Sequence, residues 1–175
     1  IAAIKITAFD DVDGEIVIET QKCQTYKTLQ GRFMITREGE GLDKKDTHRM
    51  FHAGAREVYW LRTLKSALVD GTQALLEQMQ ADGVPVETAC ISRESKSARK
   101  AVRPGLFLMV RPAGDAFKPS CLEVMIEADR TIDFHGDGWS LDPAEINFAA
   151  GRWQLKEEAT AIILAGGSSR RMGRD

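Results

Sequence analysis

The sequence has few cysteines, little net charge and no long apolar segment, and each shortage argues against a class of protein. The three cysteines, Cys23, Cys90 and Cys121, are far apart and form no Cys-x-x-Cys pair, which argues against a disulfide scaffold and a zinc site. No apolar run approaches the roughly 18 residues of a membrane helix and no signal peptide is visible, so we expect a cytoplasmic location. A net charge of −2 gives no general attraction to nucleic acid, so any anion site must be local.

What the sequence does contain is the composition of one globular core. Its 175 residues are 43% hydrophobic and 29% charged, which is ordinary for a domain with a well-buried interior. The first residue, Ile1, lies in a predicted strand and is not a methionine, and the sequence ends inside a motif. We therefore expect that the sequence is truncated at both ends.

Apolar runs alternate with helical periodicity along the chain, which predicts an α/β fold. The sheet should be mostly parallel, with flanking helices and right-handed crossovers. The segments 14–19 and 31–37 are predicted to be strands of a hairpin-like excursion, and 153–158 a linker. The other predicted strands are 1–7, 58–61, 86–91, 106–110 and 130–134; the predicted helices are a short one capped by Asp43 or Asp46 and ended by Gly54, then 66–81 and 119–128.

The most informative segment is 159–175, which joins an apolar run to a pair of glycines. Residues 161–164 are typical of a short strand buried on both faces of a parallel sheet. Gly166 and Gly167 then allow a sharp turn and a close approach of a ligand to the backbone amides. Two serines follow, and Arg171 can form a forked pair with phosphate. The alternative is a glycine- and serine-rich linker with a basic tail, which would not need a buried strand in front.

This segment resembles the Leu-Ala-Gly-Gly-x-Ser-x-Arg-Met-Gly-x-Asp-Lys signature of the molybdenum cofactor guanylyltransferases. The resemblance implies that 154–175 comprise a linker, the first strand and the GTP-holding loop of a second, Rossmann-like domain. The closing lysine of the signature, which helps to hold the phosphates in that family, has no counterpart. We therefore expect no transferase activity from this sequence alone. The matching residues are Leu164, Ala165, Gly166, Gly167, Ser169, Arg171, Met172, Gly173 and Asp175.

A second group of candidate residues lies in the polar segment 42–55. Lysine and arginine side chains bind phosphate, and carboxylates bind Mg²⁺ together with phosphate. The alternative is a solvated, capped surface helix. The candidates for phosphate ligands, a magnesium ligand and a helix cap on this one turn are Lys45, Asp46, Thr47 and Arg49.

Glu94 follows the strand predicted at 86–91. The carboxyl end of a parallel strand is where nucleotide enzymes hold Mg²⁺ or a water with an acidic group. The alternative is an ordinary loop carboxylate. A basic run brackets the same predicted edge of the sheet, unless it is only a solvated face; its members are Arg93, Lys96, Arg99, Lys100 and Arg103, with Arg111 one strand later.

Together these segments resemble the adaptor protein of molybdopterin-guanine dinucleotide biosynthesis, a P-loop GTP-binding family, over residues 1–111. The family pattern is a strand ending in Ile-Lys, then Gly-Lys-Asp-Ser/Thr-x-Arg-x-x-x-Ala-Gly-Ala, then a strand followed by an acidic residue. The resemblance implies a P-loop NTPase-like domain over 1–153, in which Lys5 and Glu94 join Lys45, Asp46, Thr47 and Arg49 at a site for GTP and Mg²⁺. The matching residues are Ile4, Lys5, Lys45, Asp46, Thr47, Arg49, Ala53, Gly54, Ala55 and, loosely, Ile91–Glu94.

The sequence departs from that family in three places. Lys44 stands where the pattern has glycine, and Ile6-Thr7-Ala8 stands where a His-rich turn is common, so a metal or base role at that turn has no support. The pattern Gly-x-x-x-x-Gly-Lys-Ser/Thr, which precedes the Ile-Lys strand in the family, occurs nowhere in the sequence. Because its amides and lysine hold the β-phosphate, we expect the chain alone to bind GTP weakly or not at all.

These resemblances predict a fragment of a molybdenum cofactor biosynthesis protein that attaches GMP from GTP to molybdopterin, with Mg²⁺ neutralising the phosphates. The expected partners are GTP, molybdopterin and other proteins of that biosynthesis or molybdoenzymes, with no nucleic acid or membrane; a homodimer is compatible with the resemblance. Two alternatives stay open. One is a non-catalytic α/β interaction module, and the other is a fragment of a cytidylyl- or sugar-nucleotidyltransferase.

Overall fold

The computed structural model describes the chain at residues 1–12, 15–16, 29–40, 46–87, 89–93, 101–102, 105–112, 126–134, 141–147, 154–155 and 162–165. No helix in these stretches is both long enough and apolar enough to cross a membrane.

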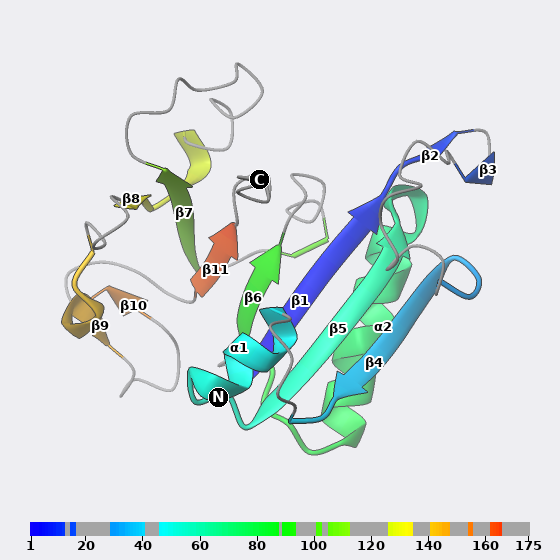
Figure 1. The fold of residues 1–175 in the computed structure, drawn as a ribbon, viewed down its shortest axis with the longest axis horizontal. Helices are drawn as coiled ribbons and strands as arrows, with labels where there is room; N and C mark the ends of the chain where they lie inside the picture. Colours follow the sequence, from blue (N-terminus) through cyan, green and yellow to red (C-terminus); the bar gives the residue numbers. More distant parts are fainter. Residues whose placement is uncertain are drawn as a thin grey trace, which may run out of the picture.

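A seven-stranded sheet organises the described part of the chain (Figure 1). Its strand order is β4-β5-β1-β6-β11-β7-β8, and all neighbours are parallel except β4, which runs antiparallel to β5. The mostly parallel α/β sheet that the sequence predicts is confirmed. The strands are β1 Ala2–Phe9, β4 Phe33–Glu38, β5 Glu57–Leu64, β6 Cys90–Arg93, β7 Leu106–Pro112, β8 Arg130–Phe134 and β11 Ile162–Ala165.

The remaining elements of the described residues are two helices, two 3-10 turns and two short strand pairs. The helices are α1 Asp46–His52 and α2 Leu68–Ala81; the 3-10 turns are η3 Lys65–Ala67 and η5 Pro143–Glu145. The strand β2 Asp11–Val12 pairs with β3 Glu15–Ile16, and β9 Ile146–Asn147 pairs with β10 Gln154–Leu155.

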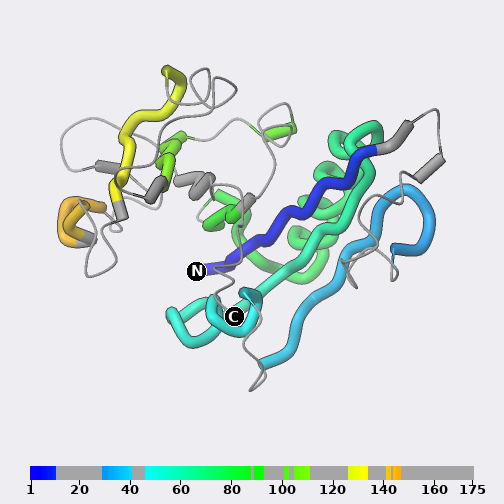
Figure 2. The backbone as a smooth tube through the Cα atoms, turned by 45° about the horizontal axis from the view of Figure 1, so that its top comes forward, coloured from blue at the N-terminus to red at the C-terminus, as the bar shows by residue number. Residues whose placement is uncertain are grey.

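The helix α2 covers one face of the sheet because its apolar residues recur at helical spacing. Leu68, Leu75 and Met79 are buried against Ile4 of β1 and Leu61 of β5. Burying side chains of this size stabilises the fold by about 1.5–3 kcal/mol each. Figures 1 and 2 show β4, β5 and β1 side by side, with α2 packed along them.

The two faces of β1 differ in chemistry. Successive side chains of a strand point to opposite faces, so Lys5 lies on the face away from the α2-facing Ile4 and Ile6. Lys5 contacts Asp46, the first residue of α1, which places α1 on the face opposite α2. One face of β1 is therefore apolar core, and the other carries polar groups beneath a short helix.

The short helix α1 ends where the sequence predicts. Gly54 has φ +96°, a left-handed conformation that glycine adopts without steric cost, and its N–H donates to the carbonyl of Phe51 at 2.9 Å. A predicted helix at 119–128 lies largely outside the described residues, and only Ile126 and Glu127 are seen to be helical.

The prediction that segments 14–19 and 31–37 form one hairpin-like excursion is wrong for the described residues. The described part of the first segment, β3, pairs with β2, whereas β4 pairs with β5 at the edge of the large sheet. The reason lies in the apolar residues of β4: Phe33 and Ile35 extend the core beneath α2. The alternation of apolar and polar residues predicted strand β4, but it is the packing of these two side chains on the core that pairs β4 with β5.

Two other strand boundaries differ from the prediction. The strand expected at 58–61 continues through Arg62 and Thr63, both of which are buried on a central strand despite their polarity. The strand expected at 86–91 begins only at Cys90, because Val86 accepts a hydrogen bond from the N–H of Ala89 in a turn.

The last described strand, β11, lies between β6 and β7 and is parallel to both. The expectation of a strand in a parallel sheet over this apolar run is confirmed. The strand completes the seven-stranded sheet, and part of the expected linker, Gln154–Leu155, forms β10. The division into an adaptor-like domain over 1–153 and a transferase segment over 154–175 stays a prediction, because the glycine loop at 166–175 lies outside the described residues.

Candidate functional site

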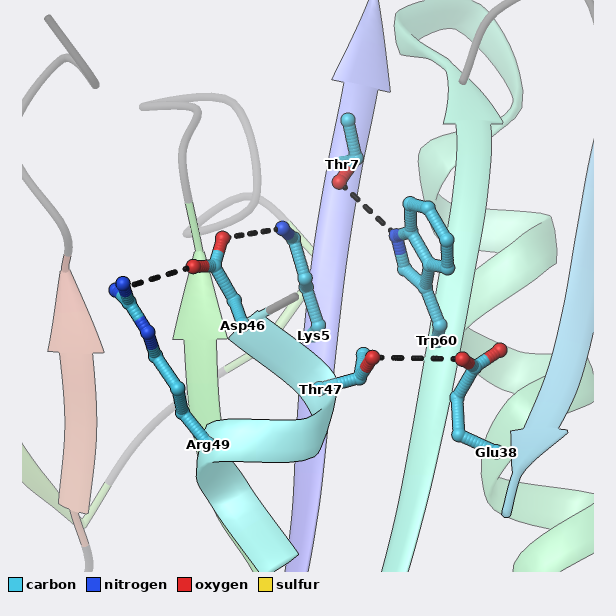
Figure 3. A network of polar contacts seen from close by, with 7 residues as sticks. All are labelled: Lys5, Thr7, Glu38, Asp46, Thr47, Arg49 and Trp60. Atoms are coloured by element: carbon cyan, nitrogen blue, oxygen red, sulfur yellow. Dashed lines mark hydrogen bonds and ion pairs between the residues drawn. The ribbon is translucent and has the colours of Figure 1, made fainter. Parts of the chain in front are cut away.

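The candidate site centres on Lys5, which lies in the middle of the central strand β1. Its side chain is only 14% exposed, and its Nζ donates to Oδ2 of Asp46 at 2.7 Å (Figure 3). A charge-assisted contact of this length joins two residues that are 41 positions apart in the sequence. The strand β1 fixes the position of the Lys5 ammonium along the sheet, and α1 brings the carboxylate of Asp46 next to it.

Asp46 contacts a second cation through its other oxygen. Its Oδ1 lies 3.7 Å from Nη1 of Arg49, three residues further along α1. Asp46 and Arg49 are 53% and 71% exposed, so this side of the cluster faces solvent. One carboxylate therefore lies between a nearly buried ammonium and an exposed guanidinium.

Trp60 of β5 forms the wall beside Lys5 on the same face. The ammonium of Lys5 lies 5.5 Å from the centroid of the indole ring, and the guanidinium carbon of Arg62 lies 4.6 Å from it. The indole Nε1–H donates to Oγ1 of Thr7 at 3.1 Å. These contacts hold the ring in one orientation, and its π face favours the two neighbouring cations.

Arg62 is 6% exposed on the same sheet face. Its Nη2 donates to the hydroxyl of Thr36 on β4, and that hydroxyl donates in turn to the carbonyl of Trp60. A buried guanidinium is stable only with such partners. The polar side chains on this face thus form a stripe that extends from β1 across β5 to the edge strand β4. Its members are Lys5, Thr7, Trp60, Arg62 and Thr36.

Thr47 takes a supporting position. It is 2% exposed, and its hydroxyl donates to Oε2 of Glu38 at 3.3 Å, which fastens α1 to the end of β4 (Figure 3). In this arrangement the hydroxyl faces Glu38. The role of Thr47 in binding phosphate or Mg²⁺ stays a prediction.

The structure thus brings together three of the candidates, Lys5, Asp46 and Arg49, and Thr47, the neighbour of Asp46 on α1, contacts Glu38. Leu164 and Ala165 lie in β11. The other candidates lie outside the described residues: Lys45, Glu94, Gly166, Gly167, Ser169, Arg171 and Asp175.

Two residues of the basic group, Arg93 and Arg111, lie near the carboxyl ends of their strands, where the sequence predicts them. Arg93 is the last residue of β6 and pairs in register with Ala165, the last residue of β11. Arg111 is the next-to-last residue of β7, and it pairs with Asp133 of β8. Glu94 and Gly166 are the next residues of the sequence after β6 and β11.

Sequence reasoning missed Trp60, Arg62 and Thr36. A signal was present, because Trp60 and Arg62 are two positions apart and share one face of a strand. Lys5 and Thr7 show the same spacing on β1, and they pair in register with Trp60 and Arg62. Only the pairing register shows that the two spacings form one polar stripe.

The free thiol of Cys90 takes no part in this chemistry. Burial raises its pKa to about 11, so the thiol stays protonated at neutral pH and is a poor nucleophile. Cys23 and Cys121 lie outside the described residues.

The fit of the cluster to Mg²⁺ rests on Asp46. Across the described stretches, no group of three or more His, Cys, Asp or Glu residues could hold a metal ion. Mg²⁺ in nucleotide sites commonly takes one or two carboxylates and completes its shell with phosphates and water. The carboxylate of Asp46 is half exposed and fits that role beside a nucleotide, with Glu94 as the second predicted carboxylate.

Comparison of the chain with protein-family models, with curated proteins and with solved structures finds no significant match.

Proposed function

We propose that this chain serves molybdenum cofactor biosynthesis, as the adaptor part and the first transferase segment of a protein that attaches GMP from GTP to molybdopterin. The adaptor residues Lys5, Asp46 and Arg49 would bind GTP and Mg²⁺ and support delivery or coupling. The loop from Gly166 to Asp175 would hold the GTP that is consumed. Pyrophosphate leaves in that reaction.

The observation that carries the proposal is the contact between Lys5 and Asp46. The resemblance to the adaptor family rests on the Ile4-Lys5 pair and a Lys-Asp-Thr-x-Arg segment, which are far apart in the sequence. In the structure this pair lies within β1, which continues to Phe9, and does not end the strand as the family pattern has it. Lys5 and Asp46, one from each segment, lie 2.7 Å apart. Two matched segments that meet at one polar site are what a shared binding function requires.

The strand that precedes the glycine segment in the sequence gives further support. The strand β11 precedes it and ends level with Arg93 of β6, at the carboxyl edge of a parallel sheet. Ligands of open α/β sheets bind outside this edge, and backbone amides that follow such a strand suit phosphate.

The test is guanylyl transfer by the full-length protein, with GTP, Mg²⁺ and molybdopterin. Replacing Arg171 with Ala should reduce the transfer rate by roughly a hundredfold or more, by analogy with the loss of one preorganised donor that stabilises developing charge. The melting temperature should hardly change, because an exposed loop arginine contributes little to stability.

The neighbouring Arg170 provides the matched control, since it occupies a variable position of the signature. Arg170→Ala should keep nearly the full rate. Equal rates in the two variants, or equal loss, would show that Arg171 does not act as the signature implies. Transfer from CTP in place of GTP would favour a cytidylyltransferase, and absence of any transfer would favour the interaction module.

A further inference from the structure

The carboxylate of Asp46 occupies a place that suits a phosphate group. Its two oxygens contact cations from two different elements, Lys5 of β1 at 2.7 Å and Arg49 of α1 at 3.7 Å (Figure 3). Ammonium and guanidinium groups bind phosphate oxygens with the same charge-assisted contacts that they make to a carboxylate. The cluster therefore has the donors of an oxyanion site, with a side chain of the protein as the oxyanion.

The two sides of the cluster differ in how firmly they are held. The Lys5 ammonium is 14% exposed and lies beside Trp60, whose ring is fixed by Thr7 and Arg62. Asp46 and Arg49 are more than half exposed. Rotation of the Asp46 side chain into solvent would leave Lys5 in place, because the strand and the indole ring set its position.

We propose that Lys5 and Arg49 form a binding site for phosphate-group anions, and that the Asp46 carboxylate holds the place of the anion until the ligand displaces it. The inference rests on the proposed function for the choice of a nucleotide's phosphate chain as the natural ligand. The site itself follows from the contacts of Asp46.

Charge decides the direction of the exchange. Asp46 carries one negative charge and is itself half exposed, so solvent screens its contacts with the two cations and keeps them weak. A pyrophosphate or triphosphate chain carries several negative charges and gains more from the same two cations. It also meets repulsion from the displaced carboxylate, so Asp46 should weaken phosphate binding when no divalent cation is present.

The test is calorimetric titration of the full chain with inorganic pyrophosphate in EDTA. We expect weak binding by the unchanged protein, in the millimolar range. Asp46→Asn removes the competing charge and should bind pyrophosphate roughly threefold to thirtyfold more tightly, which corresponds to the loss of two weak ion pairs. Arg49→Gln removes an exposed cation of the site and should bind roughly threefold to tenfold more weakly.

Two control variants make the same charge changes elsewhere. Asp70→Asn removes an exposed carboxylate on α2 that lies 3.7 Å from Arg32, and Arg56→Gln removes an exposed arginine after α1. Both should leave pyrophosphate affinity within about twofold, since screened surface charges at a distance contribute little. Melting curves of all four variants should stay close to that of the unchanged chain.

The proposal is overturned if Asp46→Asn binds pyrophosphate no more tightly than the unchanged chain, or if Asp70→Asn strengthens binding equally. It is also overturned if Arg49→Gln has no effect, or if neither the unchanged chain nor Asp46→Asn binds. Pyrophosphate has no base, so these outcomes are separate from the guanylyl-transfer test. The phosphate site can exist without transfer to molybdopterin, and transfer can occur without displacement of Asp46.

Discussion

At the scale of single residues, one buried hydroxyl joins β5 to the end of α2. The hydroxyl of Tyr59 donates to Oδ2 of Asp82, the residue after α2, at 2.6 Å. Arg37 of β4 approaches the same carboxylate at 3.9 Å and donates to Glu57 at 2.7 Å. Burial, together with the Asp82 carboxylate, raises the pKa of Tyr59 to about 12.

Tyr59→Phe should lower the free energy of unfolding by about 1–2 kcal/mol near neutral pH, because a hydrogen bond to a charged acceptor is lost. The pH dependence has a definite sign. The tyrosine pKa is raised from 10.0 in the unfolded chain to about 12 in the folded one, so its contribution is complete below pH 10 and is lost as the pH rises to about 12.

Urea unfolding between neutral pH and about pH 12 measures this effect. The unchanged protein should lose stability with rising pH more steeply than Tyr59→Phe over this range, so the gap between them should close. A constant gap would contradict the raised pKa of Tyr59, whatever the size of the hydrogen bond.

At the scale of elements, α2 approaches the sheet most closely at Gly71. A Cβ built on this residue would lie 3.1 Å from side-chain atoms of Phe33 and 3.2 Å from Leu61. Glycine is a poor helix former, so Gly71 by itself weakens the helix. The packing gives it a second role, because the missing side chain lets α2 lie against both β4 and β5.

Gly71→Ala should therefore destabilise the protein by about 1 kcal/mol. Better helix propensity would add about 1 kcal/mol of stability, but overpacking against a buried leucine costs about 1–3 kcal/mol. Urea unfolding measures the balance. Val69→Ala, at a 59% exposed position of the same helix, should change stability by less than about 0.5 kcal/mol.

A stabilised Gly71→Ala variant would contradict this expectation. It would mean that Phe33, which lies on the edge strand and is only partly buried, moves aside at little cost. Leu61, fully buried on a central strand, has no such freedom.

At the scale of the whole molecule, β7 is buried on both faces. Phe107 and Met109 belong to the large core cluster that also contains the buried residues of α2, whereas Leu106 and Leu108 pack on the other face with Ile132. Leu141 and Ile146 cover this second cluster from later in the chain. At this end the sheet thus separates two apolar clusters, and β7 contributes to both.

Leu108→Asp should prevent folding. The side chain is 1% exposed among apolar neighbours, and an unpaired carboxylate there has neither water nor a partner. Circular dichroism should show loss of ordered structure, and thermal melting should show no cooperative transition. Val69→Asp, which adds the same charge at an exposed position, should fold and melt normally; unchanged melting of Leu108→Asp would refute the core assignment.

The sequence by itself determined the features that depend on neighbouring residues. The five apolar residues from Leu106 predicted β7, and Gly54 predicted the end of α1. The helical spacing of Leu68, Leu75, Leu76 and Met79 predicted α2. These features follow from local sterics and periodic burial, which act over a few residues. The site residues were also chosen from sequence: Asp46 and Arg49 from the chemistry of one polar segment, and Lys5 through a resemblance.

Only the tertiary structure decided how these pieces meet. In the tertiary structure β4 pairs with β5, β11 lies between β6 and β7, and Arg62 is buried on the interior strand β5. The tertiary structure also brings Lys5 to Asp46 across 41 residues. Strand partners and such contacts depend on which apolar side chains share a core and on pairing register, and both are set between segments far apart in the chain.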